Sequence, residues 1–350
     1  MDKTDAMTTA ALDRPRTAPP TTTRTASDFA PLLARINDHG LLERRGVHYA
    51  VAITVNLLAF VGVCVAVVLV GASWWQLALA GLAAVLSGQS GFLGHDAGHQ
   101  QIAGSRRTNR LLGLLHGDLL LGMSYGWWTH KHNRHHANPN HEDKDPDVSS
   151  GVFVWSGDQA AGRRTRFGSW AANHQHLFFF PLLLLEGMHL KVASWRSLSQ
   201  RAPKERLVEG TLLAVHMVGY LTLVFVSMPV GMGIAFIVVH QALFGLYLGS
   251  SFAPNHKGMP MPGPGERWDF LRKQVLTSRN VRGGPVTDWA LGGLNYQVEH
   301  HLFPSMPRPN LRHAQPIVRD YCAEIGIPYT ETGLVESYAI GLRHLRDVTS

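Results

Sequence analysis

The sequence HYAVAITVNLLAFVGVCVAVVLV, residues 48–70, contains no charged side chain. A helix of about 20 mostly apolar residues is long enough to cross the hydrocarbon core of a bilayer. A second apolar stretch, residues 73–94, follows directly after Gly71-Ala72. Since each helix satisfies its own backbone hydrogen bonds in lipid, this pair predicts a hairpin that crosses the membrane and returns.

The same pattern recurs near the middle of the chain, where residues 207–228 and 231–252 are joined by Pro229-Val230. Two further apolar stretches, 111–123 and 177–190, contain polar side chains, and we expect them to be interfacial or partly buried helices rather than spans. We therefore predict an all-α membrane protein with four transmembrane helices in two hairpins. A large soluble protein with buried core helices is the alternative interpretation.

The positions of the basic residues favour the membrane interpretation. The chain has 350 residues, of which 16% are charged, and a formal net charge of +7. All 32 Lys and Arg lie outside the four spans: 7 precede the first, 14 lie between the second and third, and 11 follow the fourth. The positive-inside rule then places both termini, residues 95–206 and residues 253–350 in the cytoplasm. We expect an integral protein of a bacterial cytoplasmic membrane. The basic residues form no cluster typical of nucleic-acid binding.

The remaining composition limits the domain organisation and the metal chemistry. Residues 1–28 are polar, lack the apolar core of a signal peptide, and are expected to form a disordered tail. Residues 29–350 are expected to form a single membrane domain with a helical part on the cytoplasmic side. Cys64 and Cys322 are too few for a disulfide framework or a thiolate metal site, so any metal must be bound through nitrogen and oxygen.

Three short histidine clusters, each just outside an apolar stretch, are the strongest indication of function. They read HDAGH at 95–99, HNRHH at 132–136 and QVEHH at 297–301. Residues three or four apart share one face of a helix, so each cluster can present its side chains together. Imidazole binds iron, zinc, copper and nickel, and these ligands exceed the four of a tetrahedral zinc site. The surplus predicts two metals, with these ligands: His95, His99, His132, His135, His136, His300, His301 and Gln297.

Other polar residues near the clusters are candidates for supporting roles. His256 follows the fourth span and is a candidate for the eighth histidine ligand, with Asn255 beside it. Asp96 and Glu299 are placed to accept hydrogen bonds from ring N–H groups, which would fix the tautomers of the ligands. His216 and His240 lie within predicted spans, where polar groups are often functional. One hydrogen bond between the third and fourth spans would also explain both.

At these motifs the chain resembles the membrane-bound fatty acid desaturases, specifically the front-end-like branch with glutamine opening the third histidine box. The similar segments are HDAGH at 95–99, WWTHKHNRHHANPN at 127–140 and NYQVEHHLFPSMP at 295–307. The likeness extends from about Gly91 to Leu311. It implies a nonheme di-iron centre, with O2 as co-substrate, held by the eight histidines named above; Gln297 would bind iron directly or act through water.

The resemblance also implies a reaction and partners. The expected activity is O2-dependent introduction of a cis double bond into a long-chain fatty acyl substrate, either acyl-CoA or acyl-lipid. Many eukaryotic front-end enzymes carry a fused cytochrome b5-type domain, and this chain shows no such motif. Electrons are therefore expected from a separate ferredoxin or rubredoxin-type donor with a flavin reductase. Basic residues of the central loop, such as Arg106 and Arg163, are interpreted as membrane anchors rather than phosphate ligands.

Three alternatives remain open at this stage. A related di-iron hydroxylase or acetylenase would use a similar histidine set. A metal transporter or sensor would hold its ligands near the bilayer midplane, whereas these lie at the ends of spans. A metallohydrolase would need a general-base carboxylate in an HExxH context, and HDAGH offers only an aspartate. The sequence does not specify the double-bond position, the chain length, the acyl carrier or the oligomeric state.

Overall fold

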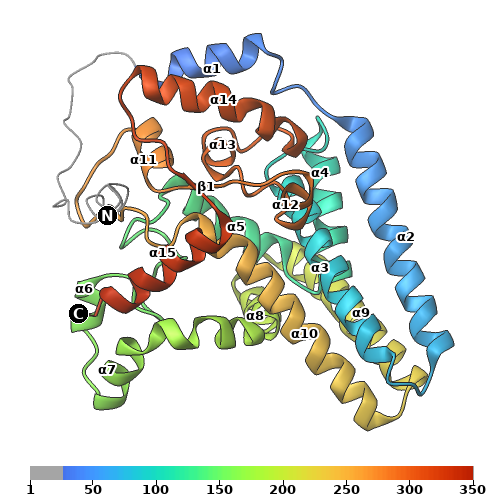
Figure 1. The fold of residues 1–350 in the computed structure, drawn as a ribbon. Coiled ribbons are helices and arrows are strands. Elements are labelled where there is room, and N and C mark those ends of the chain that lie inside the picture. The colour runs from blue at the N-terminus through green and yellow to red at the C-terminus, as the bar shows by residue number, and fades with distance from the viewer. Residues whose placement is uncertain (1–26, 350) are drawn as a thin grey trace, which may run out of the picture.

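The computed structural model describes residues 27–349 and is dominated by helices (Figure 1). Most of the predicted tail, residues 1–26, lies outside the described part. The last residue of that predicted tail packs against the body of the protein. Asp28 forms an ion pair with Arg272 at 2.9 Å, and its backbone carbonyl accepts a hydrogen bond from Tyr321 at 2.6 Å.

Four long helices form the two predicted hairpins, and Figure 1 shows them extending together to one side of the molecule. Their bounds are α2 Gly46–Val70, α3 Gln76–Gly98, α9 Pro203–Ser227 and α10 Val230–Phe252. Each is long and apolar enough to cross a membrane. At the tips of the hairpins, Val67, Val224 and Phe236 belong to one buried apolar cluster, so the two hairpins pack as a unit.

A fifth helix, α8 (Gln175–Ser197), also has the length and apolarity of a span. The apolar stretch 177–190 is therefore part of a longer helix than expected, because the helix continues through polar residues at both ends. Its length and composition alone do not place it across the membrane, and its assignment as an interfacial or partly buried helix stays a prediction. The helix packs tightly on α10 at Gly187 and Gly245. A Cβ atom added to either glycine would lie 2.5 Å from backbone atoms of the facing helix, so only glycine permits this approach.

The other apolar stretch, 111–123, is divided between two elements that pack beside α3 and α9: α4 (Arg106–Gly113) and the π-helix η1 (Leu114–Leu121). Much of η1 is buried, as expected for a partly buried helix. π-Helical turns are rare and are frequent near functional sites. Here η1 lies against α3 at Gly94, one residue before the first histidine cluster.

The two histidines within the hairpins do not bond to each other. The ring of His216 contacts the carbonyl of Leu119 at 2.9 Å and the ammonium of Lys191 at 3.2 Å. The ring of His240 lies 3.2 Å from the hydroxyl of Ser87 and 2.8 Å from that of Tyr220. A hydrogen bond between α9 and α10 is thus present, but it joins His240 to Tyr220. His216 instead connects α9 to η1 and α8, and His240 also contacts α3.

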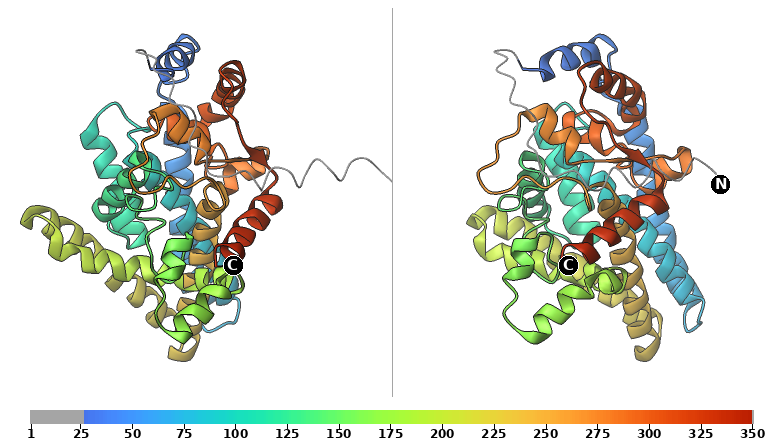
Figure 2. Two further views of the ribbon diagram at one scale, coloured as in Figure 1. Left: turned by 90° about the vertical axis from the view of Figure 1, so that its left-hand side faces the viewer. Right: turned by 60° about the vertical axis from the view of Figure 1, so that its left-hand side comes forward.

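A helical cap lies at the other end of the hairpins (Figure 1), and Figure 2 shows it from two further sides. Its helices α1 and α14 enclose an apolar core that includes Leu32, Val298 and Met306. Two short parallel strands pair Asn280 with Glu331. The bounds of the remaining elements are α1 Phe29–Asp38, α5 Tyr125–Ala137, α6 Gly157–Ala161, α7 Arg166–Asn173, η2 Leu198–Gln200, η3 Ala253–Asn255, α11 Phe270–Leu276, β1 Asn280–Val281, α12 Pro285–Ala290, α13 Gln297–Leu302, α14 Arg308–Glu324, β2 Glu331–Thr332 and α15 Leu334–Asp347.

Candidate metal centre

The three histidine clusters, far apart in the sequence, converge where the hairpins meet the cap. The first cluster ends α3, the second lies on α5, and the third lies on α13. The start of α5 is fixed by Ser124, whose hydroxyl accepts a hydrogen bond from the backbone N–H of Trp127 at 3.0 Å. From that start, the predicted i, i+3, i+4 spacing turns the second cluster toward the other two.

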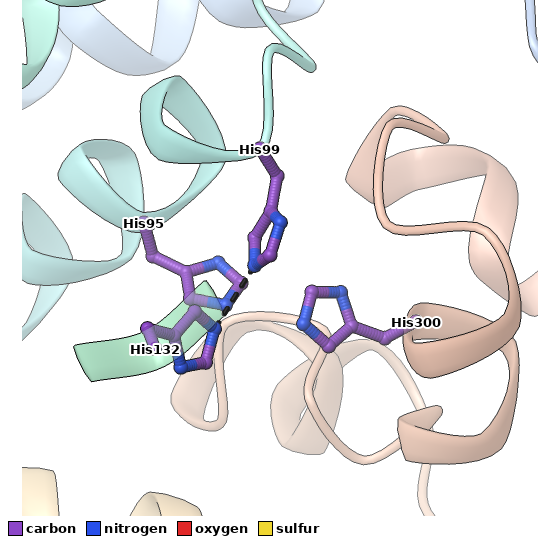
Figure 3. A group of neighbouring side chains, drawn as sticks. All are labelled: His95, His99, His132 and His300. Carbon is purple, nitrogen blue, oxygen red and sulfur yellow. Dashed lines mark hydrogen bonds between the residues drawn. The ribbon is translucent and has the colours of Figure 1, made fainter. Parts of the chain in front are cut away.

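The first group of ligand candidates contains His95, His99, His132 and His300 (Figure 3). One ring nitrogen of each lies within 4.8 Å of the others, and all four side chains are buried. The Nε2 atoms of His99 and His132 are 2.9 Å apart. Figure 3 shows the four rings reaching one common point from α3, α5 and α13.

The second group contains His135, His256 and His301, again with ring nitrogens within 4.8 Å. Gln297 belongs to this group, because its Nε2 lies 2.9 Å from Nε2 of His256. His136 lies between the two groups: its Nε2 is 3.1 Å from that of His132 in the first group, and its ring stacks on His301 of the second at a centroid distance of 4.2 Å. The structure thus brings all nine ligand candidates predicted from the sequence into one region.

Several nitrogens in this region are buried without a hydrogen-bond partner among residues 27–349. They are Nε2 of His95, Nδ1 of His136, Nε2 of His301 and both ring nitrogens of His300. Each unsatisfied buried donor or acceptor costs ~1–3 kcal/mol. A concentration of such atoms at one point is unfavourable unless another species satisfies them, and a metal ion bound by their lone pairs would do so.

The protonation states suit metal binding as well. Burial, together with the neighbouring histidines, lowers the pKa of the following rings well below its ordinary range: His99, His132, His136, His300 and His301. Burial also lowers the pKa of His256 to about 3. These imidazoles are therefore neutral near pH 7, the form in which imidazole ligates metals. The nitrogen-rich donor set in two groups fits two transition-metal ions of the kind that imidazole binds.

Polar partners hold the outward-facing ring nitrogens of the second group. His135 Nδ1 contacts Asp145 at 2.9 Å, His256 Nδ1 contacts the carbonyl of Thr277 at 3.0 Å, and His301 Nδ1 contacts Gln274 at 2.9 Å. Such contacts fix the tautomer and the orientation of a ligand. Burial would lower the pKa of His135, but the carboxylates of Asp145 and Asp147 outweigh burial and raise it.

Only some of the residues that contact the ligand candidates were predicted from the sequence. Asp96 contacts His95 as expected, at 3.2 Å, and its other oxygen pairs with Arg308 at 2.5 Å. Asp145 could have been assigned from the Asp-Pro-Asp motif that follows the second cluster. Gln274 and Thr277 carry no comparable signal, because they lie on α11 and directly after it, in a segment that has no motif of its own.

One supporting residue, Glu299, differs from expectation. The carboxylate of Glu299 does not accept from a ring N–H; it accepts from Asn280 and from Tyr329, both at 2.7 Å. The reason is that Glu299 points from α13 toward the cap core and away from its histidine neighbours. Burial there raises its pKa to about 7. Asn255 donates to the side-chain oxygen of Gln297 at 3.2 Å, so it contacts a ligand candidate.

Several known proteins are similar to this chain over most of its length. A family model described as fatty acid desaturase matches residues 72–333. An acyl-lipid (9-3)-desaturase of Physcomitrium patens is 30% identical over 92% of this chain, which spans 62% of the length of that relative. A delta(8)-fatty-acid desaturase of Arabidopsis thaliana is 30% identical over 91% of this chain and 74% of its own length. A delta(6)-fatty-acid desaturase of Caenorhabditis elegans is 29% identical, with the same coverage of both chains.

Proposed function

Because the chain belongs to the fatty acid desaturase family, we propose that it introduces a cis double bond into a long-chain fatty acyl substrate with consumption of O2. The observation that carries this proposal is the convergence of the three histidine clusters into two facing groups with unsatisfied buried nitrogens. The names of the relatives support an oxidoreductase acting on acyl chains.

The proposed cofactor is a nonheme pair of iron ions. His95, His99, His132 and His300 would hold one ion, and His135, His256 and His301 the other. His136 lies within reach of both groups, and Gln297 would complete the second group directly or through water. When bound, the iron pair supplies the redox chemistry with O2 that removing hydrogen from an unactivated methylene requires.

The chain itself would position the substrate and exclude water. Trp128 and Phe252 face His95 with ring centroids at 5.4 and 6.3 Å, so the wall beside the first group is apolar. These rings continue into an apolar cluster that contains Leu121 and Leu248, between α10 and η1. An apolar wall suits an alkyl chain and keeps bulk water from the reacting carbons.

The location and the electron source complete the proposal. We place the hairpins in the membrane, with the cap and both termini in the cytoplasm, from the distribution of Lys and Arg. We propose a separate ferredoxin or rubredoxin-type donor with its flavin reductase as the electron source. Reconstitution with each donor in turn, with O2 consumption as the readout, tests this part independently.

Expression in a host of known lipid composition tests the main proposal. New double bonds would be located by mass spectrometry of the host lipids. We expect them with the wild type and with the control His313→Ala, an exposed histidine outside the site, and not with His300→Ala. Hydroxylated products would instead support the hydroxylase alternative. Unchanged lipids from an iron-loaded protein supplied with a competent reductase would contradict both.

A further inference from the structure

Arg279, directly before β1, has no exposed surface. Its guanidinium donates hydrogen bonds to the backbone carbonyls of Pro254 at 2.7 Å, Lys257 at 2.6 Å and Ser337 at 3.3 Å. None of these three acceptors carries a charge. Burying a cation is costly unless its donors are satisfied, and here backbone carbonyls satisfy them. The side chain is therefore placed to hold backbone rather than to form an ion pair.

The backbone that Arg279 holds is the turn that carries His256. This histidine follows α10 and η3 and is a ligand candidate of the second group. Pro254 and Lys257, whose carbonyls accept from the guanidinium, flank it on both sides. Carbonyls at the C-terminal end of a helix lack partners within the helix and carry partial negative charge, so a cation is favourable there. Arg279 thus closes the end of α10 where the chain enters the metal centre.

The backbone of the same segment holds the histidine as well. The carbonyl of Thr277 accepts a hydrogen bond from Nδ1 of His256 at 3.0 Å, and the backbone N–H of Arg279 donates to the carbonyl of Asn255 at 2.9 Å. With Nδ1 engaged, Nε2 of His256 is the nitrogen that faces the second group, where it lies 2.9 Å from Nε2 of Gln297. Residues 277–279 therefore set both the position of the turn and the direction of the ring.

Helix α15 braces the turn from the other side. The hydroxyl of Ser337 donates to the same Pro254 carbonyl at 2.5 Å, and the hydroxyl of Tyr338 donates to the carbonyl of Ser250 near the end of α10 at 2.6 Å. The Pro254 carbonyl therefore has two donors, whereas the Lys257 carbonyl accepts from the guanidinium alone among the side chains of residues 27–349. Without the guanidinium, the turn would be held on one side of His256 only.

We propose that Arg279 is a positioning residue for the second group: its guanidinium holds the turn that presents His256 to the metal. This inference rests on the proposed metal centre and not on the identity of the substrate or the electron donor. The first group takes its ligand candidates from α3 with its C-terminal end, from α5 and from α13, and none of them lies on this turn. Metal binding in the first group should therefore not depend on Arg279.

The test is Arg279→Lys in the full-length, iron-loaded protein, titrated against a competing chelator. Lysine keeps the positive charge but lacks the planar fork that spans two carbonyls. We expect one ion to leave at about 10- to 100-fold less chelator than in the wild type, the usual effect of losing a residue that orients a metal ligand, and the other ion to be retained. The matched control Arg282→Lys changes an arginine three residues further on, whose side chain is 58% exposed, and should behave as the wild type.

A spectroscopic readout separates positioning from general stability. Cobalt replaces iron at saturating concentration, because the visible absorption of Co(II) depends on the number and geometry of its ligands. Arg279→Lys should change this absorption in the same direction as His256→Ala does. The stability control Val318→Ala, in the buried core of the cap, should lower the melting temperature and leave the absorption of the bound cobalt unchanged.

The outcomes are distinct. Loss of both ions from Arg279→Lys in proportion to its melting temperature, with a wild-type cobalt spectrum, overturns the proposal. If Arg279→Lys does not fold, Ser337→Ala, which removes the other donor to the Pro254 carbonyl, should weaken the same ion about 2- to 10-fold, the effect of one hydrogen bond, and unchanged binding there also overturns it. A wild type that binds neither ion overturns the proposed metal centre, and this inference with it.

Discussion

Replacing Asp145 with asparagine should weaken metal binding in the second group of histidines. Both oxygens of this buried carboxylate accept hydrogen bonds. Oδ2 contacts His135 Nδ1 at 2.9 Å and the backbone N–H of Asn140 at 2.8 Å, and Oδ1 accepts from the backbone N–H of Asp147 at 2.9 Å. An asparagine in either orientation would place its NH2 group against a backbone N–H.

The magnitude follows from these contacts. One backbone N–H loses its acceptor, which costs ~1–3 kcal/mol of folding free energy. Loss of the carboxylate also lowers the pKa of His135, because Asp145 is the first group that raises it, and a less basic ring is a weaker ligand. Removing such a partner of a metal ligand typically lowers metal affinity by about 10- to 100-fold. We expect this loss in the second group and little change in the first.

The assay is a titration of bound iron against a competing chelator, with iron measured by elemental analysis. The wild type should retain two irons per chain over one range of chelator, and Asp145→Asn should release one of them at about 10- to 100-fold less chelator. The control is Asp143→Asn, because Asp143 is exposed and close in sequence. If Asp145→Asn holds both ions as tightly as the control does, the assignment of His135 as an oriented ligand is refuted.

Three further predictions concern stability, packing and orientation. The metal-free protein should lose thermal stability, measured by calorimetry, as the pH falls from about 6.5 toward 4. Burial lowers the pKa of the clustered histidines in the folded protein, so the unfolded chain binds more protons over this range. If the rings are solvated, the melting temperature should not decrease. Gly98→Ala should reduce desaturation, because the new Cβ would lie 2.7 Å from the ring of Trp128 and push α3 away from α5. The control Gly104→Ala has open space around the new Cβ, and its desaturation should be unchanged in the same lipid assay. In intact bacterial cells a membrane-impermeant maleimide should label Ser73→Cys at a hairpin tip and spare Asp143→Cys; the opposite pattern would reverse the proposed topology.

The sequence predicted the hairpins well because their signal is local. The span at residues 48–70 can be recognised from its own composition. The histidine clusters can be recognised as ligand candidates from the spacing of their residues along a helix. The extent of α8 was underestimated because its ends are polar, and the close approach at Gly187 and Gly245 depends on a distant helix.

The contacts of single polar side chains were harder to predict. One hydrogen bond between the third and fourth spans accounts for His240, which contacts Tyr220, but not for His216, which faces η1, since helix rotation is set by the packing of the whole bundle. Glu299 likewise follows the rotation of a short helix, α13, whose direction is fixed by the cap core. Partners such as Gln274 come from segments far away in the sequence, and no local pattern indicates them.

The division of the ligands among helices has a consequence for biogenesis. Each of the two groups needs α13, which is synthesised after all five apolar helices. At ~5–20 residues per second, roughly 10 to 40 s pass between the synthesis of His99 and that of His300. Neither group of ligand candidates can therefore be complete while the apolar helices are being synthesised. The full ligand set of either position forms only once the bundle is finished.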